Sequence, residues 1–151
     1  MIRLVEIDDT NWSDVARLSV ADDQKRYLDS PLGIVARGYA YRAHRAKVIG
    51  IADEETLVGV ALVKDLDEEP ACYDLQQFLI DHRYQNKGYG TQALTAILHA
   101  LQKERKYDCV EVCVDREDRS ALHVYQKVGF VDTGYIDPDL PDHFNLMYYF
   151  E

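Results

Sequence analysis

Residues 78–94 read FLIDHRYQNKGYGTQAL, a strand-like run followed by a polar turn and the start of a helix. Two glycines, Gly88 and Gly90, stand beside Lys87 where that helix begins, with one residue between them. Glycine allows tight turns and a close approach of the backbone to a ligand. A helix N-terminus offers free N–H groups and the positive end of the helix dipole, which together attract phosphate. The stretch therefore predicts a phosphate-binding loop.

The sequence on either side of this loop predicts short strands mixed with helices. Apolar residues at Leu94, Ile97, Leu98 and Leu101 follow the i, i+3, i+4, i+7 spacing of a helix with one buried face. An acidic turn at 53–55 separates two apolar runs, which is typical of an antiparallel hairpin. We expect strands at 2–6, 48–52, 57–63, 72–81, 109–114, 130–136 and 144–150. We expect other helices from residue 9 or 10 to 18, at 21–28, at 34–45 after an interruption at Pro31, and around 121–128, where Gly129 ends the helix.

Composition and charge limit the classes of function. The chain has 151 residues, of which 47% are hydrophobic, enough for one domain with a sizeable core. Its 17 Lys and Arg against 27 Asp and Glu give a net charge of -10. Nucleic-acid binding without sequence preference needs a basic surface, so this charge argues against it and permits a cationic partner. No apolar run approaches a membrane span, and the start MIRLVEIDDT lacks the apolar region of a signal peptide. We therefore expect a cytoplasmic protein with no membrane partner.

The cysteines and histidines predict neither a disulfide framework nor a metal site. Three cysteines are an odd number, which does not suggest a set of disulfides. No cluster of His and Cys has the spacing of a zinc site. We expect no bound metal.

A dinucleotide-binding loop is one interpretation of the glycines. Residues 88–93 formally match G-x-G-x-x-A, and Asp108 or Glu111 lies about 20 positions further on. That fingerprint belongs in a βαβ unit, whereas an apparent antiparallel hairpin precedes this loop. Too little chain follows to complete a doubly wound sheet, so the dinucleotide interpretation is disfavoured.

A second interpretation depends on more residues. FLIDHRYQNKGYGTQAL resembles the Q/R-x-x-G-x-G/A acyl-CoA-binding motif of the GNAT superfamily of N-acyltransferases. DRSALHVYQKVGF, residues 118–130, resembles the later N-x-x-A-x-x-x-Y-x-K-x-G-F motif of the same family. The resemblance implies an α+β fold over residues 1–151 as a single domain. Its central mixed and mostly antiparallel sheet would splay open at a V-shaped cleft and be flanked by helices.

The same resemblance implies acetyl-CoA as co-substrate. Backbone N–H groups of the loop would hold the pyrophosphate, from Gln85, Asn86, Lys87, Gly88, Tyr89, Gly90 and Thr91. Phe78, Leu79 and Ile80 would offer main-chain groups to the pantetheine arm, as if it were an added strand. Side chains at 74, 76, 78 and 80 would share one face of that strand unless a bulge intervenes, and the family commonly carries one here.

Tyr125 is the expected proton donor to the departing thiolate, because a phenol stays protonated at neutral pH. Asp118 departs from the family, which usually has Asn there in contact with pantetheine. Aspartate cannot donate when ionised, although it serves equally as a helix N-cap. Two possibilities stay open for the general base: Asp74 acts through water, or there is no dedicated base. Gln76 occupies the position where similar polyamine acetyltransferases often have glutamate, and it cannot take a proton.

Three further stretches look most like bacterial spermine/spermidine acetyltransferases: QKRYLDSPLG at 24–33, YDLQQFLID at 73–81 and YQNKGYG at 84–90. This similarity implies direct transfer of acetyl to a polyamine in a ternary complex, with Gln76, Tyr27 and Asp29 as candidate acceptor-binding residues. Two alternatives stay open. One is acetylation of another amine, such as an aminoglycoside, a small metabolite or a protein N-terminus, and the other is a non-catalytic acyl-CoA-binding module. Dimers are common in the family, so a homodimer is a further expectation.

Overall fold

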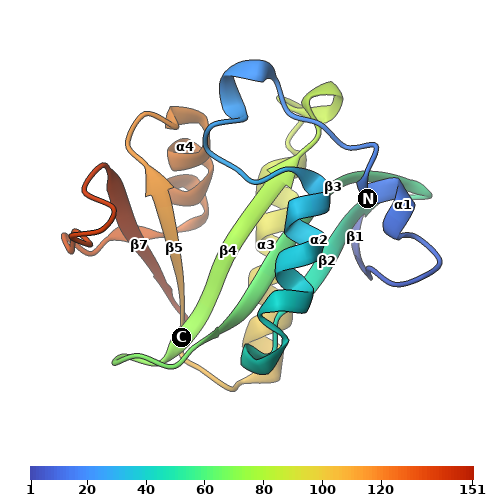
Figure 1. The fold of residues 1–151 in the computed structure, drawn as a ribbon. Coiled ribbons are helices and arrows are strands. Elements are labelled where there is room, and N and C mark those ends of the chain that lie inside the picture. Colours follow the sequence, from blue (N-terminus) through green and yellow to red (C-terminus); the bar gives the residue numbers. More distant parts are fainter.

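The computed structural model describes all residues from 1 to 151 (Figure 1). Its strands are β1 Ile2–Glu6, β2 Lys47–Asp53, β3 Thr56–Leu66, β4 Cys72–Ile80, β5 Cys109–Asp115, β6 Val131–Asp132 and β7 His143–Tyr149. Its α-helices are α1 Trp12–Val15, α2 Pro31–Ala40, α3 Tyr89–Glu104 and α4 Arg119–Val128. Single 3₁₀ turns lie at Asp22–Gln24, Arg42–His44 and His82–Tyr84. No helix has the length and apolar character needed to cross a membrane.

The strands form one sheet in the order β1-β2-β3-β4-β5-β7-β6. Every neighbouring pair is antiparallel except β4 and β5, which are parallel and share only two register pairs, Tyr73 with Val110 and Asp74 with Glu111. Beyond these pairs the two strands separate, and Figure 1 shows the gap widening toward α4. The predicted mixed, mostly antiparallel and splayed sheet is confirmed.

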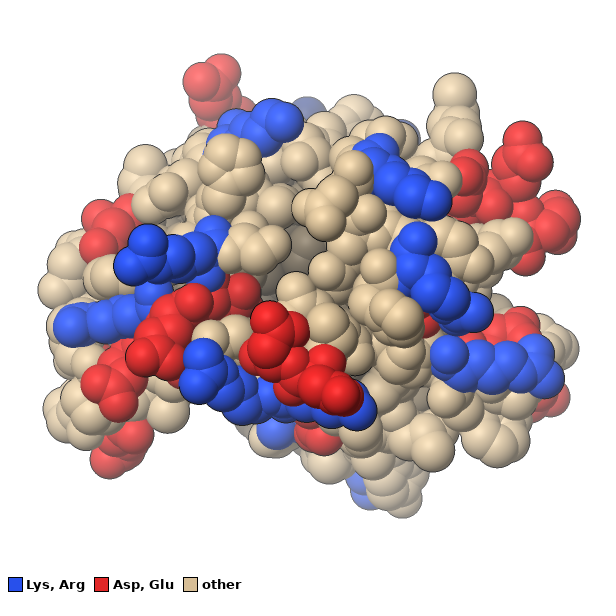
Figure 2. Space-filling view, turned by 90° about the horizontal axis from the view of Figure 1, so that it is seen from above, with Lys and Arg blue, Asp and Glu red and all other residues tan.

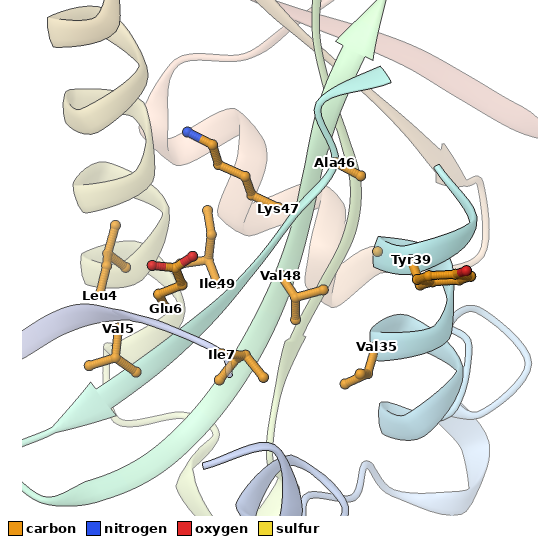
Figure 3. Close-up of a pocket in the computed structure, with 11 residues that line it drawn as sticks. Leu4, Val5, Glu6, Ile7, Val35, Tyr39, Ala46, Lys47, Val48 and Ile49 are labelled. Carbon is orange, nitrogen blue, oxygen red and sulfur yellow. The ribbon is translucent and has the colours of Figure 1, made fainter. Parts of the chain in front are cut away.

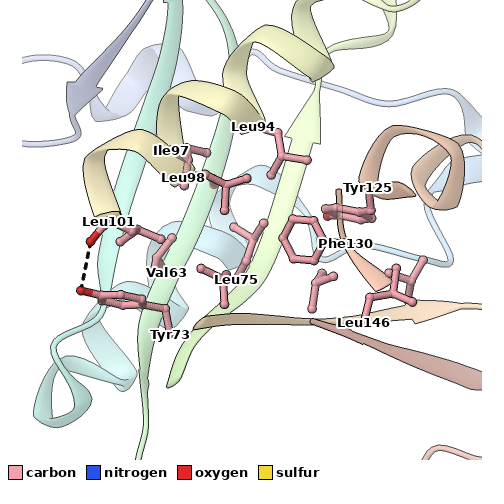
Figure 4. Close-up of a cluster of buried hydrophobic side chains, with 14 residues drawn as sticks. Val63, Tyr73, Leu75, Leu94, Ile97, Leu98, Leu101, Tyr125, Phe130 and Leu146 are labelled. Carbon is pink, nitrogen blue, oxygen red and sulfur yellow. Dashed lines mark hydrogen bonds between the residues drawn. The ribbon is translucent and has the colours of Figure 1, made fainter. Parts of the chain in front are cut away.

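Helices cover both faces of the sheet. α3 lies on one face with α4, and α2 lies on the other with α1 (Figure 1). The apolar stripe of α3 packs into the largest core cluster, and its residues Leu94, Ile97, Leu98 and Leu101 are all buried there, as the spacing predicts. Figure 4 shows this cluster between α3, the sheet and α4, with Tyr73 donating a hydrogen bond to the Leu101 carbonyl. Each such buried side chain contributes about 1.5–3 kcal/mol relative to an exposed one.

A β-bulge in β4 changes which side chains share a face. Leu62 of β3 pairs with Gln77 and the next residue, Val63, pairs with Leu75, so Gln76 is the extra residue. Side chains 74, 76 and 77 consequently face α2, where Lys64 and Arg37 contact the first two and the Asp29 backbone donates to the third. Phe78 packs instead against the α3 and α4 side. The shared face of 74, 76, 78 and 80 was expected only in the absence of a bulge, and the bulge that the resemblance implies puts Phe78 on the opposite face from 74 and 76.

Several predicted helices are shorter or begin elsewhere. Pro31 does not interrupt a helix but opens α2, because a first-turn proline needs no N–H partner and Ser30 Oγ accepts from the Gly33 N–H as N-cap. The helix expected at 34–45 ends at Ala40, and Arg45 adopts a left-handed conformation with φ 55°. The helix expected from 9 or 10 to 18 is only Trp12–Val15, since Asp8 accepts hydrogen bonds from Thr10 and holds a turn before it.

Two other segments lack the predicted regular structure. Residues 21–28 form only the turn Asp22–Gln24, and no residue of this turn is buried, so a weak helical tendency has no packing face to stabilise it. The strand expected at 130–136 is only Val131–Asp132, because Gly134, two residues after its end, takes φ 78°. Thr133 ends the pairing by donating through both its N–H and its hydroxyl to the Asn145 carbonyl.

The buried carboxylate of Asp65, near the end of β3, connects the sheet with the turn after α2 and with the chain just after α3. Asp65 is 5% exposed and accepts two hydrogen bonds from the Arg45 guanidinium, at 2.8 and 3.0 Å, and one from Lys106 at 2.8 Å. Burial raises the pKa of Asp65, but these hydrogen bonds outweigh it and lower the pKa to about 2. The contacts join segments far apart in the sequence, so this network stabilises the tertiary structure.

Replacing this carboxylate should weaken the fold in a pH-dependent way. The unfolded pKa of Asp is about 3.9, so a folded pKa of about 2 stabilises the ionised state by about 2.5 kcal/mol at neutral pH. This stabilisation is fully present above the unfolded pKa and is lost as pH falls through the folded pKa. Urea unfolding of Asp65→Asn should show about that deficit at pH 7 and about half of it at pH 3.

Asp67→Asn is the matched control, because the Asp67 side chain is 71% exposed and touches only His44, at 3.8 Å. An Asp65→Asn deficit no larger than that of the control, or one unchanged between the two pH values, would contradict this role for Asp65.

Candidate active site

A cavity of about 530 Å³ lies where β4 ends, beside the start of α3 and along α4. Val20, Gln24 and Leu28 close it from the segment before α2. Seen from the end of the molecule that carries these loops, the surface is hollowed at its centre, with acidic and basic side chains around the hollow (Figure 2). The cavity is next to the gap between β4 and β5, so the splayed sheet and the predicted phosphate loop open on the same space.

The structure brings together most of the predicted coenzyme-binding residues. Those lining the cavity are Phe78, Ile80, Gln85, Asn86, Gly88, Gly90, Thr91, Asp118 and Tyr125. Three others do not line it. Leu79 is 1% exposed in the core cluster under α2, Tyr89 donates its hydroxyl to Asp53, and Lys87 lies 6.0 Å from the centre of the Tyr84 ring.

The loop before α3 is fixed by its own backbone and by the side chain of Gln85. Asn86 and Gly88 both take left-handed conformations, with φ 61° and 82°, which turn the chain sharply into the helix. The Gln85 amide donates to the Ile80 carbonyl at 2.9 Å and also pairs with the amide of Gln24. The loop is therefore held in place from both β4 and the segment that closes the cavity.

The N-terminus of α3 is left without a side-chain cap. α2 begins with Ser30 as cap and α4 with Asp118, whereas Gly88 offers no side chain to the first N–H groups of α3. Those groups have no partner within the helix either. A Cβ added at Gly90 would meet nothing closer than Val124, at 3.8 Å, so packing does not require glycine there. The bare backbone at this turn leaves room for an anion to approach the N–H groups.

The nearby basic side chains are unequal candidates for a phosphate contact. Arg83 donates its guanidinium to Asp81, at 2.9 and 3.0 Å, and Asp81 is fully buried. Burial raises the pKa of Asp81, but the hydrogen bonds from Arg83 and the Ser19 N–H outweigh it and lower the pKa. Arg83 is thus engaged in the fold, whereas Arg119 and Lys127 line the cavity from α4.

Tyr125 is 5% exposed and sits at the floor of the cavity. Its ring centre lies 6.2 Å from that of Phe78 and 5.3 Å from that of Phe130, so packing on both sides fixes it. The Tyr125 hydroxyl makes no hydrogen bond within the protein. It is not a fully buried polar atom without a partner either, because the side-chain atom of that kind is His143 Nδ1. The hydroxyl therefore opens on the cavity. Burial, and then the charge of Asp118, raise the pKa of Tyr125, which keeps it protonated at neutral pH.

The Asp118 side chain both caps α4 and lines the cavity, the two possibilities that the sequence left open. Its carboxylate accepts from the Ala121 N–H at 3.2 Å as the N-cap of α4, and the same side chain lines the cavity. Burial raises the pKa of Asp118, and the Ala121 N–H partly offsets this. The carboxylate thus brings negative charge close to Tyr125.

On the α2 side of the sheet, the candidate base Asp74 and the predicted acceptor-binding residues each contact a basic side chain. Asp74 lies 3.2 Å from the Lys64 ammonium, and burial raises its pKa while Lys64 opposes that rise. Arg37 of α2 donates to Asp29 at 2.7 Å and to the Gln76 side chain at 3.2 Å. Tyr27 lies against Arg26, whose guanidinium carbon is 4.8 Å from its ring centre. None of Asp74, Gln76, Tyr27 and Asp29 lines the cavity itself.

Sequence reasoning missed several residues of this region. Ser120 and His123 line the cavity with Lys127, and their i, i+3, i+7 spacing on a predicted helix was the signal that could have found them. Lys64 and Arg37 come from β3 and α2, and no local pattern marks them, while Glu111 was named only as an acidic residue for the dinucleotide interpretation. Their place beside β4 is evident only from the tertiary structure.

A second cavity, of about 500 Å³, lies between α2 and the strands β1 and β2. Figure 3 shows Val35 of α2 facing Ile7 and Val48 across it. Eight of its eleven lining residues are hydrophobic, and its charged members are Glu6 and Lys47. It contains none of the motif residues, so the first cavity is the candidate active site.

The sequence and the fold of this chain are similar to those of known proteins. Residues 8–130 match the model of the Acetyltransferase (GNAT) family. The spermine/spermidine N(1)-acetyltransferase of Bacillus subtilis (strain 168) is 29% identical over 141 residues, which are 90% of this chain and 91% of the relative.

Two solved structures share the fold at low sequence identity. The spermidine N-acetyltransferase of Vibrio cholerae, in complex with CoA and spermine, aligns with a TM-score of 0.76 and 15% identity over 98% of this chain and 95% of its own. An aminoglycoside acetyltransferase in complex with coenzyme A aligns with a TM-score of 0.80 and 14% identity over 99% of this chain and 95% of its own.

Proposed function

The chain belongs to the GNAT family of acetyltransferases, and from this we propose that it transfers acetyl from acetyl-CoA to a primary amine, with a polyamine such as spermine or spermidine as acceptor. The observation that carries the proposal is one cavity that holds both the uncapped start of α3 and the free hydroxyl of Tyr125. An anion site and a proton donor in the same space suit a phosphate-bearing acyl donor with a leaving group.

The residues around the cavity fit acetyl-CoA, which supplies an activated thioester. Backbone N–H groups at the start of α3 and in the loop 85–91 would bind its pyrophosphate, and the bare backbone at Gly90 gives the room. Main-chain groups of β4 at Phe78–Ile80 have no strand partner on the β5 side, because β5 pairs only with Tyr73 and Asp74. Apart from the Ile80 carbonyl, which accepts from the Gln85 amide, the groups of this stretch that point away from β3 are free to hydrogen-bond the pantetheine arm as an added strand would.

Tyr125 has the properties of the general acid. Its buried ring is held between two aromatic neighbours, its pKa is raised, and its hydroxyl has no competing partner in the protein. It would donate its proton to the sulfur as the thiol departs. Asp74 is the candidate to receive a proton from the amine through water, since the bulge puts Gln76 beside it and an amide cannot act as a base.

Polyamine is the favoured acceptor for two reasons. The relative from Bacillus subtilis is a spermine/spermidine acetyltransferase, and it aligns over nearly the whole chain. The net charge of -10 attracts a polycation more strongly than a monoamine.

Gly90→Asp should separate coenzyme binding from folding. A carboxylate in the first turn of α3 complements the helix dipole, so the melting temperature should hold or rise. The same carboxylate faces the cavity and would repel a pyrophosphate, so calorimetry should show acetyl-CoA affinity falling about 10-fold or more.

Gln92→Asp is the matched control, because it adds the same charge in the same helical turn at an exposed residue outside the cavity. Equal losses of affinity in the two variants, or a folded Gly90→Asp with unchanged affinity, would remove the loop from the coenzyme site.

Tyr125→Phe should bind acetyl-CoA nearly as well as the wild type but turn over about 10²–10⁴-fold more slowly, because only the proton donor is lost. Steady-state thiol release together with a coenzyme titration checks both parts. A rate within about twofold of wild type, with chemistry shown to be rate-limiting, would exclude Tyr125 as the acid.

Acceptor identity is tested by following thiol release from acetyl-CoA with spermine, spermidine, a diamine, an aminoglycoside and a peptide. We expect the highest kcat/KM for a polyamine. Much faster acetylation of the aminoglycoside or the peptide would overturn the polyamine assignment and leave an amine acetyltransferase. Coenzyme binding without release for any acceptor would instead favour a non-catalytic acyl-CoA-binding module.

A further inference from the structure

We propose that Glu111 of β5 holds the non-reacting ammonium group of the polyamine, and so selects acceptors that carry a second positive charge. This inference rests on the function proposed above. It gives a role to a residue that lies outside both GNAT motifs, at the place where β4 and β5 part.

Sheet register places Glu111 on the acceptor side. Asp74 pairs with Lys64 on one side and with Glu111 on the other, so the three side chains form a row across β3, β4 and β5. The Lys64 ammonium lies 5.5 Å from the centre of the Tyr41 ring, in the turn after α2, which fixes the face of the row. This is the face opposite the α3 core, and it is also the face of Gln76.

One alkylammonium group of the protein itself, that of Lys64, already lies in the row. Lys64 places its ammonium 3.2 Å from Asp74, over an aromatic ring, with its side chain 12% exposed. A carboxylate beside an aromatic face is a favourable site for an organic cation. This pair therefore shows that the geometry of the row suits an alkylammonium, and it gives Asp74 a cationic partner that Glu111 lacks.

Glu111 is the carboxylate of the row without a cation. It is half-buried, and its nearest polar partner is the Cys72 thiol at 3.8 Å. Burial raises the pKa of Glu111, and the charge of Asp74 raises it further, with smaller contributions from Glu68 and Asp137. The groups that face it from β4, from the β3–β4 connection and from the β6–β7 connection are thus thiol or acidic. A bound ammonium would relieve this repulsion.

The spacing along β5 suits a polyamine. Glu111 and the exposed Cys113 point to the same face, and two residues of strand rise separate them by about 6.6 Å. The propyl or butyl spacer of spermidine covers a distance of this order. One nitrogen can then lie at Glu111 while the next lies higher in the gap, toward the bulge of β4 and the cavity. A monoamine has no group to place at Glu111.

The test compares spermidine with a butyl monoamine in the wild type, Glu111→Gln and Glu55→Gln. Glu55 lies in the exposed β2–β3 turn, so its variant controls for the loss of one negative charge. Glu111→Gln should raise the KM for spermidine about 10-fold or more, because a charge-assisted hydrogen bond is lost. The monoamine KM and both kcat values should stay within about twofold, as should all constants of the control.

Equal changes for spermidine and the monoamine, or an unchanged spermidine KM, would overturn the role of Glu111 and leave the proposed function standing. A wild type that acetylates no amine would overturn both. If Glu111→Gln does not fold, Glu111→Asp keeps the charge but withdraws it by one methylene group. It should then raise the KM for spermidine alone, and an equal effect on the monoamine would again overturn the proposal.

Discussion

Two register pairs, Tyr73 with Val110 and Asp74 with Glu111, are all that join the two halves of the sheet. Beyond them β4 pairs only with β3 and β5 pairs only with β7. The bulge at Gln76 lets β4 change which residues face α2 just past this junction. On the other side, Phe78, Tyr125 and Phe130 pack in sequence behind the gap, so the opening has a rigid aromatic wall. The uncapped start of α3 and the Tyr125 hydroxyl open on the space beside this parting of strands, and there we propose the anion site and the proton donor.

The two sides of the gap differ in how they present charge. Toward α3 and α4 the positive groups are the uncapped backbone N–H groups at the start of α3 together with Arg119 and Lys127 of the cavity lining, whereas Arg83 is engaged by the buried Asp81. Toward α2 the charges are side chains, and most are already matched, as Lys64 with Asp74 and Arg37 with Asp29 show. Glu111 is the member of that side left unmatched. An anionic donor on one side and a cationic acceptor on the other suit transfer between them.

Much of this could be predicted from local patterns. The apolar spacing after Gly90 predicts α3 and its buried face, and the two motifs place the loop and Tyr125 in one cavity. Patterns failed where tertiary contacts decide. Nothing in DLQQF announces a bulge, since it depends on how β3 aligns with β4. Pro31 was misjudged because a proline ends or begins a helix according to its cap, and Ser30 makes it a beginning. Strand register alone places Lys64 and Glu111 beside Asp74, and the packing of α2 alone places Arg37 beside Gln76, and no short stretch encodes either.

We propose that the coenzyme occupies the gap opened by the parting of β4 and β5. Amide hydrogen exchange with and without acetyl-CoA tests this, because unpaired N–H groups on the open edge of β4 exchange quickly until they gain a partner. We expect new protection at Phe78–Ile80 and across residues 85–91, with little change in β1 and β2. Protection confined to the apolar cavity beside β1, where Val35 faces Val48, would contradict it.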